Sequence, residues 1–337
     1  MKIPFCTKKL IIISILISFF SCSEIEVKPT QELVSPKSCS TMDESNLDIH
    51  QILERHNKLE EIEKHYQEYI RKYPNGESNR NTITIPVVVH VLYRTTTQNI
   101  SDSQIFSQIN SLNKDFSGTN SDTILIPNDF KSLKANCEIQ FCLAKTDPNG
   151  KPTTGITRKQ TKITSFTTNN RVKQTSLGGV NPWNTSQYLN IWVCVLANSI
   201  VGYSQMPGGD PATDGVVIDY RYFGTMGTAT APYNKGRVTT HEIGHWLNLK
   251  HIWGDATCGD DLVSDTPIHN GPNYYCQIQP HYSQCGSKPR EMTMNYMDYS
   301  DDACMFMFTN GQKQRMRAVL SSGGFRNTLV NSHGCNP

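Results

Sequence analysis

The chain has 337 residues, enough for one large domain with additional segments. Its formal net charge of +2 at pH 7 is too small to favour binding to nucleic acid or to an anionic membrane surface. With 37% hydrophobic and 18% charged residues, the composition is typical of a soluble globular protein.

The N-terminus has the pattern of an export signal. Lysines precede the apolar run LIIISILISFF, which is too short to cross a bilayer comfortably. The run ends at Ser21 and Cys22, a pattern that resembles a bacterial lipobox. We therefore expect a signal peptide over residues 1–21 and a lipid on Cys22 that holds an exported protein to the cell envelope, at the outer membrane or the surface. The alternative is an ordinary signal peptide, an incidental Cys22 and a secreted protein.

Residues 22–81 are expected to form a tether and a helical pro-segment. The stretch from Glu24 to Ser40 is polar and contains proline, as a tether does. Over Leu47–Tyr73 apolar residues recur at helical spacing among charges, and the following Pro-Asn-Gly ends the helix. The alternative for this helix is a solvated spacer with no role in control.

Residues 82–337 predict one α+β domain. It starts with the β-branched run TITIPVVVHVLY, which favours a buried strand. The expected strands are Ile83–Tyr93, Ile139–Leu143, Tyr188–Leu196 and Gly215–Tyr220, and the expected helices are Asp102–Phe116 after Ser101, a helix after Gly236, and Asn310–Leu320.

The run HEIGHWLNLKH, which starts at His241, carries the strongest chemical signal. In a helix, His241 and His245 lie one turn apart on the same face and can bind one metal ion. His251 can supply a third ligand if the helix ends and the chain turns back. Three protein ligands with a fourth position for water are typical of catalytic zinc. Glu242 is placed to activate a zinc-bound water, so we expect a zinc hydrolase.

Other interpretations of this motif are open. A bare HExxH can arise by chance, and a binding protein could be built on an inactive zincin scaffold. A gluzincin-type peptidase would take a distant Glu as its third ligand. The intact Glu242 argues against an inactive scaffold. His251 and the downstream NYMDY argue against a gluzincin.

The pattern HExxHxxGxxH followed by a Met-containing turn is that of the metzincins, and NYMDY at Asn295–Tyr299 resembles that turn. More narrowly, HEIGHWLNLKHIWGD followed by CGDD and DTP resembles the pappalysin family, including its ulilysin-like bacterial members. The resemblance extends over about 83–327. It implies a metalloendopeptidase that cleaves proteins or peptides and works as a monomer.

The resemblance also implies a fold and residue roles. The fold is a twisted, mostly parallel sheet with backing and active-site helices and a loop-rich C-terminal subdomain held by disulfides. Met297 would lie beneath the metal as an apolar floor, and Tyr299 would hydrogen-bond the tetrahedral intermediate; the alternative for Tyr299 is a buried structural tyrosine. Asn248 replaces the family's glycine, where a left-handed residue must end the helix, and asparagine tolerates that conformation.

An acidic loop follows the third histidine and is dense in carboxylates, which suit calcium. The resemblance implies calcium here too, with Asp261, Asp265 and Thr266 as ligands. The alternative is a solvated acidic loop. We therefore expect zinc and calcium as the metal cofactors.

The chain has 11 cysteines, which suits an oxidising compartment. By resemblance, Cys258 pairs with Cys285 and Cys276 with Cys304. The sequence leaves open the pairing of Cys137, Cys142, Cys194 and Cys335.

Cys39 lies in KSCSTMD, which resembles the cysteine motif in the leader of ulilysin-like proenzymes, with Ser40 where Gly is commoner. A thiolate is a strong zinc ligand, so Cys39 could keep the enzyme latent until cleavage between Arg71 and Asn81. The alternative is an unpaired leader cysteine. The physiological substrate and the subsite preferences do not follow from the sequence.

Overall fold

The computed structural model describes residues 38–41, 49–74 and 81–336. The predicted signal peptide 1–21, the lipidation site Cys22 and most of the predicted tether lie outside the described residues. Within the described ranges, no helix is both long enough and apolar enough to span a bilayer.

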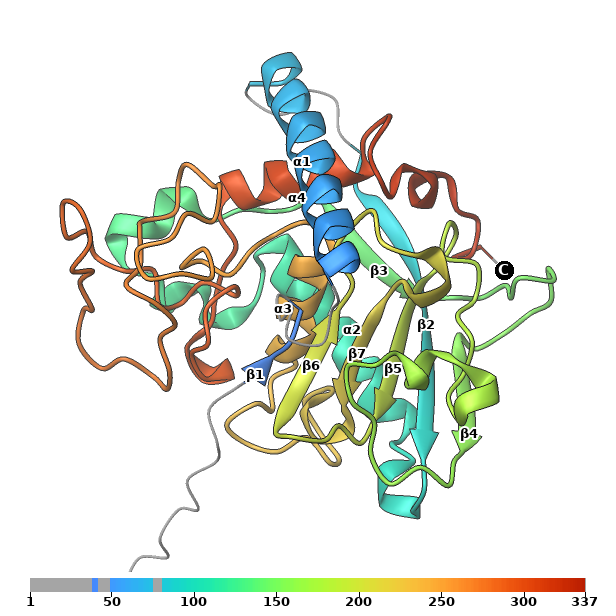
Figure 1. Ribbon diagram of the computed structural model, residues 1–337. Helices are drawn as coiled ribbons and strands as arrows, with labels where there is room; N and C mark the ends of the chain where they lie inside the picture. The colour runs from blue at the N-terminus through green and yellow to red at the C-terminus, as the bar shows by residue number, and fades with distance from the viewer. Residues whose placement is uncertain (1–37, 42–48, 75–80, 337) are drawn as a thin grey trace, which may run out of the picture. The chain divides into compact units, whose positions relative to one another are not determined.

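A seven-stranded sheet organises the described part of the chain (Figure 1). Its strands are β1 (Ser38–Cys39), β2 (Ile83–Tyr93), β3 (Ile139–Leu143), β4 (Ile156–Gln160), β5 (Leu189–Cys194), β6 (Ile200–Ser204) and β7 (Val216–Asp219). Their order is β1-β6-β7-β5-β2-β3, and β4 pairs with the second half of β2. Every pairing is parallel except that of β6 with β7. The predicted α+β class with a mostly parallel sheet is confirmed.

The central strands are buried on both faces, and β2 is exposed only at its ends. This agrees with the unbroken apolar run that predicted β2, because a parallel strand covered on both sides has no polar face. The prediction omitted β1, β4 and β6, and β1 lies within the stretch expected to be a tether. β4 alternates half-buried and exposed residues, and β6 is a short run, IVGYS, with a glycine in its middle.

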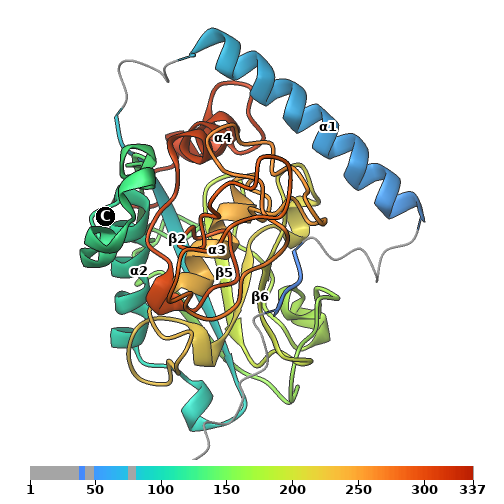
Figure 2. The ribbon, with the colours of Figure 1, turned by 90° about the vertical axis from the view of Figure 1, so that its left-hand side faces the viewer.

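The helices are α1 (Ile49–Lys72), α2 (Asp102–Ser117), α3 (Arg237–Trp246) and α4 (Asn310–Leu320). The Ser101 hydroxyl accepts a bond from Gln104 N at the start of α2, and Gly118 ends the helix at φ 64°. α2 packs against β3 and α3, and α3 packs against β6 and β7. The helix α1 lies along the outside of the domain against α4 (Figure 2), where Tyr66 and Tyr69 bury against Ala318.

Between α3 and α4 the chain is almost free of regular structure, and disulfides connect it. Cys258 pairs with Cys285 and Cys276 with Cys304, the two pairs that the resemblance implies. A third disulfide, Cys142–Cys335, joins β3 to the C-terminal tail and answers part of what the sequence left open. Cys137 and Cys194 are buried thiols in the core.

The turn after α3 requires a left-handed residue. Asn248 has φ 77°, and the N–H of Leu249 donates back to Gly244 O over 2.9 Å. Arg315 on α4 fixes the turn from outside, because its Nε donates to Asn248 O over 2.9 Å. The chain then reverses towards His251.

Substitutions at Asn248 should separate backbone strain from side-chain loss. Asn248→Gly should keep the free energy of unfolding of the full-length protein within about 1 kcal/mol of the parent, since glycine adopts this conformation without a Cβ penalty. Asn248→Ala should lower it by about 1–2 kcal/mol, the cost of a left-handed alanine. Urea unfolding followed by tryptophan fluorescence measures both. An Ala variant as stable as the Gly variant would contradict the requirement for a left-handed residue.

Candidate metal centre

Three histidine side chains converge at the end of α3. His241 and His245 project from one face of the helix, and the turn at Asn248 brings His251 to meet them. The Nε2 of His245 lies 3.1 Å from the Nε2 of His241 and 3.1 Å from that of His251. All three residues are buried. The structure thus brings together the residues that the sequence singled out as zinc ligands.

The hydrogen-bond partner of Nδ1, the ring nitrogen that points away from the cluster, determines which nitrogen of each histidine carries the proton. His241 Nδ1 is 2.7 Å from Tyr296 O, and His245 Nδ1 is 2.7 Å from Leu249 O. A carbonyl oxygen can only accept, so each Nδ1 carries the hydrogen and each Nε2 directs a lone pair inwards. His251 Nδ1 faces the Asp255 carboxylate in the same way. Inward lone pairs backed by outer acceptors are the arrangement of a metal-binding triad, so these residues fit a zinc ion.

Cys39, on the leader strand β1, is the fourth side chain of this cluster. Its sulfur and the nitrogens of the three histidines lie within 4.8 Å of one another. The residue as a whole is half-buried, but its sulfur faces the histidines. Burial and then the nearby Glu242 carboxylate raise the pKa of the thiol. A divalent cation among these atoms would oppose both effects and favour the thiolate.

Cys39 is held in place by pairing with the edge of the sheet. β1 runs parallel to β6, with Cys39 opposite Gly202, and Ser40 N donates to Gly202 O over 3.4 Å. Gly202 lies at a close approach, because a Cβ there would be only 3.0 Å from both Glu242 Cγ and Ile218 Cδ1. The same glycine interrupts the strand pattern of β6, which is why the sequence analysis missed this strand, and it leaves space for the Glu242 side chain.

Glu242 is buried beside the triad, and residues of the leader contact it. Its Oε2 accepts a bond from Thr41 Oγ1 over 2.9 Å and lies 3.5 Å from Cys39 Sγ and 3.4 Å from Ser204 Oγ. Ser204 N also donates to Thr41 Oγ1 over 2.9 Å. The sequence analysis missed Thr41. The available signal was its spacing, since residues two apart on an extended chain face the same side.

Met297 and Tyr299 both lie close to the histidine cluster. Met297 is buried under α3, where a Cβ on Gly244 would come within 2.5 Å of its sulfur. The Tyr299 ring centroid lies 4.9 Å from that of His251 and 4.7 Å from that of Trp253. Its hydroxyl donates to the Cys39 carbonyl oxygen over 3.3 Å. Burial raises the pKa of Tyr299, so the hydroxyl keeps its proton and acts as a donor.

The acidic loop brings two of its three predicted calcium ligands together. The Thr266 hydroxyl lies 2.9 Å and 3.0 Å from the two carboxylate oxygens of Asp261, and burial raises the pKa of Asp261 to about 7. Asp265 instead accepts bonds from Thr309 Oγ1 over 2.7 Å and from Gly311 N over 2.8 Å, at the start of α4. Asp265 thus caps a helix in this structure.

Comparison with known proteins agrees with this geometry. The family model described as pregnancy-associated plasma protein-A, Peptidase M43, matches residues 173–321. An extracellular metalloprotease of Arthroderma benhamiae is 31% identical over 240 residues, which is 69% of this chain and 76% of that protein. An extracellular metalloprotease of Colletotrichum graminicola is 44% identical over 113 residues, 32% of this chain and 39% of that protein.

Two solved structures are similar over longer ranges. Mature mirolysin of Tannerella forsythia in complex with a cleaved peptide is 48% identical with a TM-score of 0.74, covering 77% of this chain and 100% of that one. A promirolysin variant of the same organism is 42% identical with a TM-score of 0.80, covering 89% of this chain and 100% of that one. The proenzyme form therefore aligns with more of this chain than the mature form does.

Proposed function

The chain belongs to the pappalysin (M43) family and is a metalloendopeptidase, and we propose that it is an exported zinc enzyme made as a latent proenzyme. In this proposal His241, His245 and His251 hold the zinc and Glu242 is the general base. The observation that carries it is the convergence of three imidazole lone pairs beside a buried carboxylate. The zinc, when bound, supplies a Lewis acid that polarises a peptide carbonyl and makes water acidic enough to attack near neutral pH.

The residues of the chain divide the remaining work. Glu242 takes a proton from the attacking water and delivers it to the leaving amine nitrogen. The Tyr299 hydroxyl donates a hydrogen bond to the scissile carbonyl oxygen as negative charge develops there. The outer acceptors of the histidines keep the rings neutral and oriented.

The edge strand β6 is the proposed platform for the substrate. In the latent form β1 pairs with it over Ser38–Cys39. Once β1 leaves, the backbone groups of β6 can pair with an extended peptide, a recurring mode of peptide recognition. This orients the scissile bond towards Glu242, which lies directly behind Gly202. A noncatalytic binding protein would have no use for a carboxylate at this point.

Glu242→Ala should separate metal binding from catalysis. The variant should keep one zinc per chain, because its histidines are intact, and should lose at least about 10²–10⁴-fold in the rate of casein cleavage after processing by an added protease. His251→Ala serves as the contrast and should lose the metal together with activity. Metal analysis and cleavage with and without a zinc chelator provide the measurements. Full activity in Glu242→Ala would show that the general base is a different residue.

We propose that latency comes from three contacts made by one short segment. The Cys39 thiol takes the place that the catalytic water needs, the Thr41 hydroxyl engages Glu242, and the Cys39 carbonyl engages Tyr299. The helix α1 within the proposed pro-segment 22–81 supports them, since Arg55 Nη2 donates to Thr41 O over 2.7 Å. Cleavage between Arg71 and Asn81 would free the catalytic domain, 82–337. We further propose that the protein is exported and anchored through Cys22.

Removing the thiol should weaken latency before any processing. Unprocessed Cys39→Ala should cleave a fluorogenic peptide and itself faster than the parent, because water can then reach the metal. Thr41→Val should show a smaller effect, since it frees Glu242 but leaves the thiol in place. Ser40→Ala is the matched control in the same segment and should stay latent. If unprocessed Cys39→Ala is as inactive as the parent, the thiol does not keep the enzyme latent.

We also propose a structural calcium ion at the acidic loop, supported by the buried Asp261 carboxylate beside Thr266 and by the density of carboxylates in this part of the sequence. Removing calcium selectively, with zinc kept saturating, should lower the melting temperature and speed self-cleavage. Asp261→Asn should melt at a temperature that calcium no longer changes. A parent melting curve that is unaffected by calcium would argue against this ion.

A further inference from the structure

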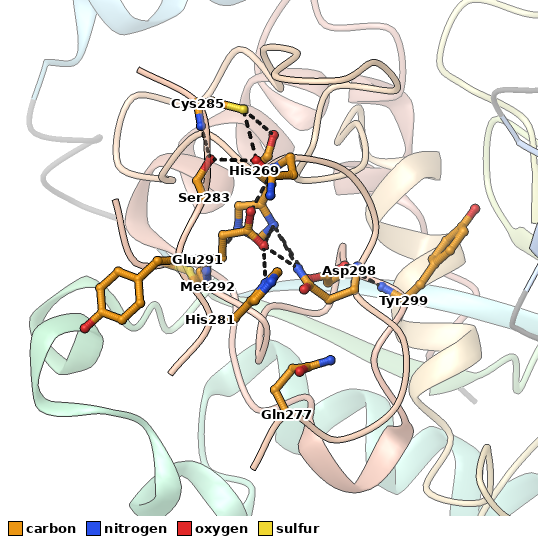
Figure 3. A network of polar contacts seen from close by, with 12 residues as sticks. His269, Gln277, His281, Ser283, Cys285, Glu291, Met292, Asp298 and Tyr299 are labelled. Carbon is orange, nitrogen blue, oxygen red and sulfur yellow. Dashed lines mark hydrogen bonds and ion pairs between the residues drawn. The ribbon is translucent and has the colours of Figure 1, made fainter. Parts of the chain in front are cut away.

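A buried polar network connects Asp298, beside Tyr299, with Glu291 and His269 (Figure 3). Asp298 lies between these two residues and is fully buried. Its Oδ1 accepts the N–H of Tyr299 and the N–H of Asn273, each over 2.8 Å. Its Oδ2 accepts a bond from the Asn273 side-chain amide over 3.0 Å. The carboxylate therefore joins the backbone of Tyr299 to a distant part of the loop region.

The Asn273 amide is itself held by a second buried carboxylate. Its Nδ2 also donates to Glu291 Oε2 over 2.8 Å, and Glu291 Oε1 accepts Asn270 N over 2.8 Å. The half-exposed His281 lies against the same carboxylate, with its Nδ1 2.9 Å from Glu291 Oε2. Contacts thus run without a break from the surface to the backbone of Tyr299.

His269 closes the network from one side, and its proton position can be assigned. Its Nε2 accepts the N–H of Met292 over 3.0 Å, so Nδ1 carries the hydrogen when the ring is neutral. That Nδ1 lies 3.7 Å from Asp298 Oδ2 and 3.8 Å from Glu291 Oε2. Burial lowers the pKa of His269 to about 4, which favours this neutral form. The N–H of the ring faces both carboxylates.

Tyr299 needs anchors that survive activation. The contact of its hydroxyl with the Cys39 carbonyl belongs to the latent form and leaves with the pro-segment. The bond from its N–H to Asp298 lies wholly inside the catalytic domain, as does the bridge between Tyr274 and Tyr299. The position of the backbone here decides where the hydroxyl lies relative to the histidines.

We propose that Asp298 is a positioning residue for Tyr299, and that Asn273 and Glu291 hold Asp298 in turn. The inference rests on the role that the proposed function gives Tyr299. Asp298 and Asn273 are not interchangeable, because Asn273 must donate to two carboxylates at once. An amide at position 298 would present a donor to the Asn273 donor and break the bridge, while keeping the size of the side chain.

A double-mutant cycle on the processed enzyme tests this. Asp298→Asn should lower kcat on a fluorogenic peptide by about tenfold or more, with KM within about twofold, since a small displacement of a catalytic group costs that much. Tyr299→Phe should lower kcat at least as far. The double variant should be no slower than Tyr299→Phe alone, because Asp298 acts only through that hydroxyl. Zinc content should be unchanged throughout.

Asp302→Asn is the matched control. Asp302 is equally buried in the same segment, but its Oδ2 accepts from Lys235 N and Arg237 N at the start of α3. When Asp302→Asn is combined with Tyr299→Phe, the fold loss of kcat should equal the product of the two single losses, because the two residues act independently. If Asp298→Asn does not fold, Asn273→Ala replaces it in the cycle under the same criterion.

Three outcomes would overturn the inference. The first is a loss of kcat in the double variant equal to the product of the losses in Asp298→Asn and Tyr299→Phe. The second is a parental kcat in Asp298→Asn, and the third is a parental kcat in Tyr299→Phe. The first two leave the proposed function intact, and the third also removes the proposed role of Tyr299. Failure of the proposed function as a whole is recognised separately, by an active Glu242→Ala.

Discussion

The position of one proton on each of three imidazole rings is the constraint on which this site depends. The Nε2 of His245 lies 3.1 Å from the Nε2 atoms of both His241 and His251. Three N–H groups facing one another there would repel, whereas three inward lone pairs suit a shared metal ion. The proton must then lie on Nδ1, and each Nδ1 needs an acceptor. Tyr296 O, Leu249 O and the Asp255 carboxylate supply these acceptors.

Those acceptors explain why such different parts of the chain must meet. Leu249 O can reach His245 only because Asn248 takes a left-handed conformation and folds the chain back. Tyr296 O belongs to the loop region far along the sequence, so the turn before Met297 orients the ring of His241. That loop region has few ladder hydrogen bonds of its own. Its disulfides lower the conformational entropy of the unfolded chain, which stabilises the folded loop region in place of the missing regular structure.

The sequence reveals the parts of the site that depend on local spacing. Two histidines four residues apart on a buried helix and a nearby carboxylate can be recognised without any tertiary information, as can the apolar run of β2. Edge strand β6 is different, because it is short, contains Gly202 and gains its partners only from the fold. The same holds for the Cys142–Cys335 pair, with a sequence separation of 193, and for the contact of Thr41 with Glu242. These depend on long-range geometry that no local pattern encodes.

Because an extended strand turns alternate residues to one side, Cys39 and Thr41 reach the histidines and Glu242 together, while the carbonyl of Cys39 reaches Tyr299. The contacts of Cys39 and Thr41 therefore form or break together.

The helix α1 helps to hold this segment in place. On α1, Glu63 bonds to Arg315 of α4 over 2.5 Å, and Arg315 also lies 4.8 Å from the Tyr66 ring. Arg315 in turn holds Asn248 O, at the turn that delivers His251. Attachment through α1 raises the effective concentration of Cys39 at the site, and this no longer applies once α1 dissociates. In the proposed activation, cutting the chain after α1 would be only the first step, since the cut segment would still have to leave both α4 and β6.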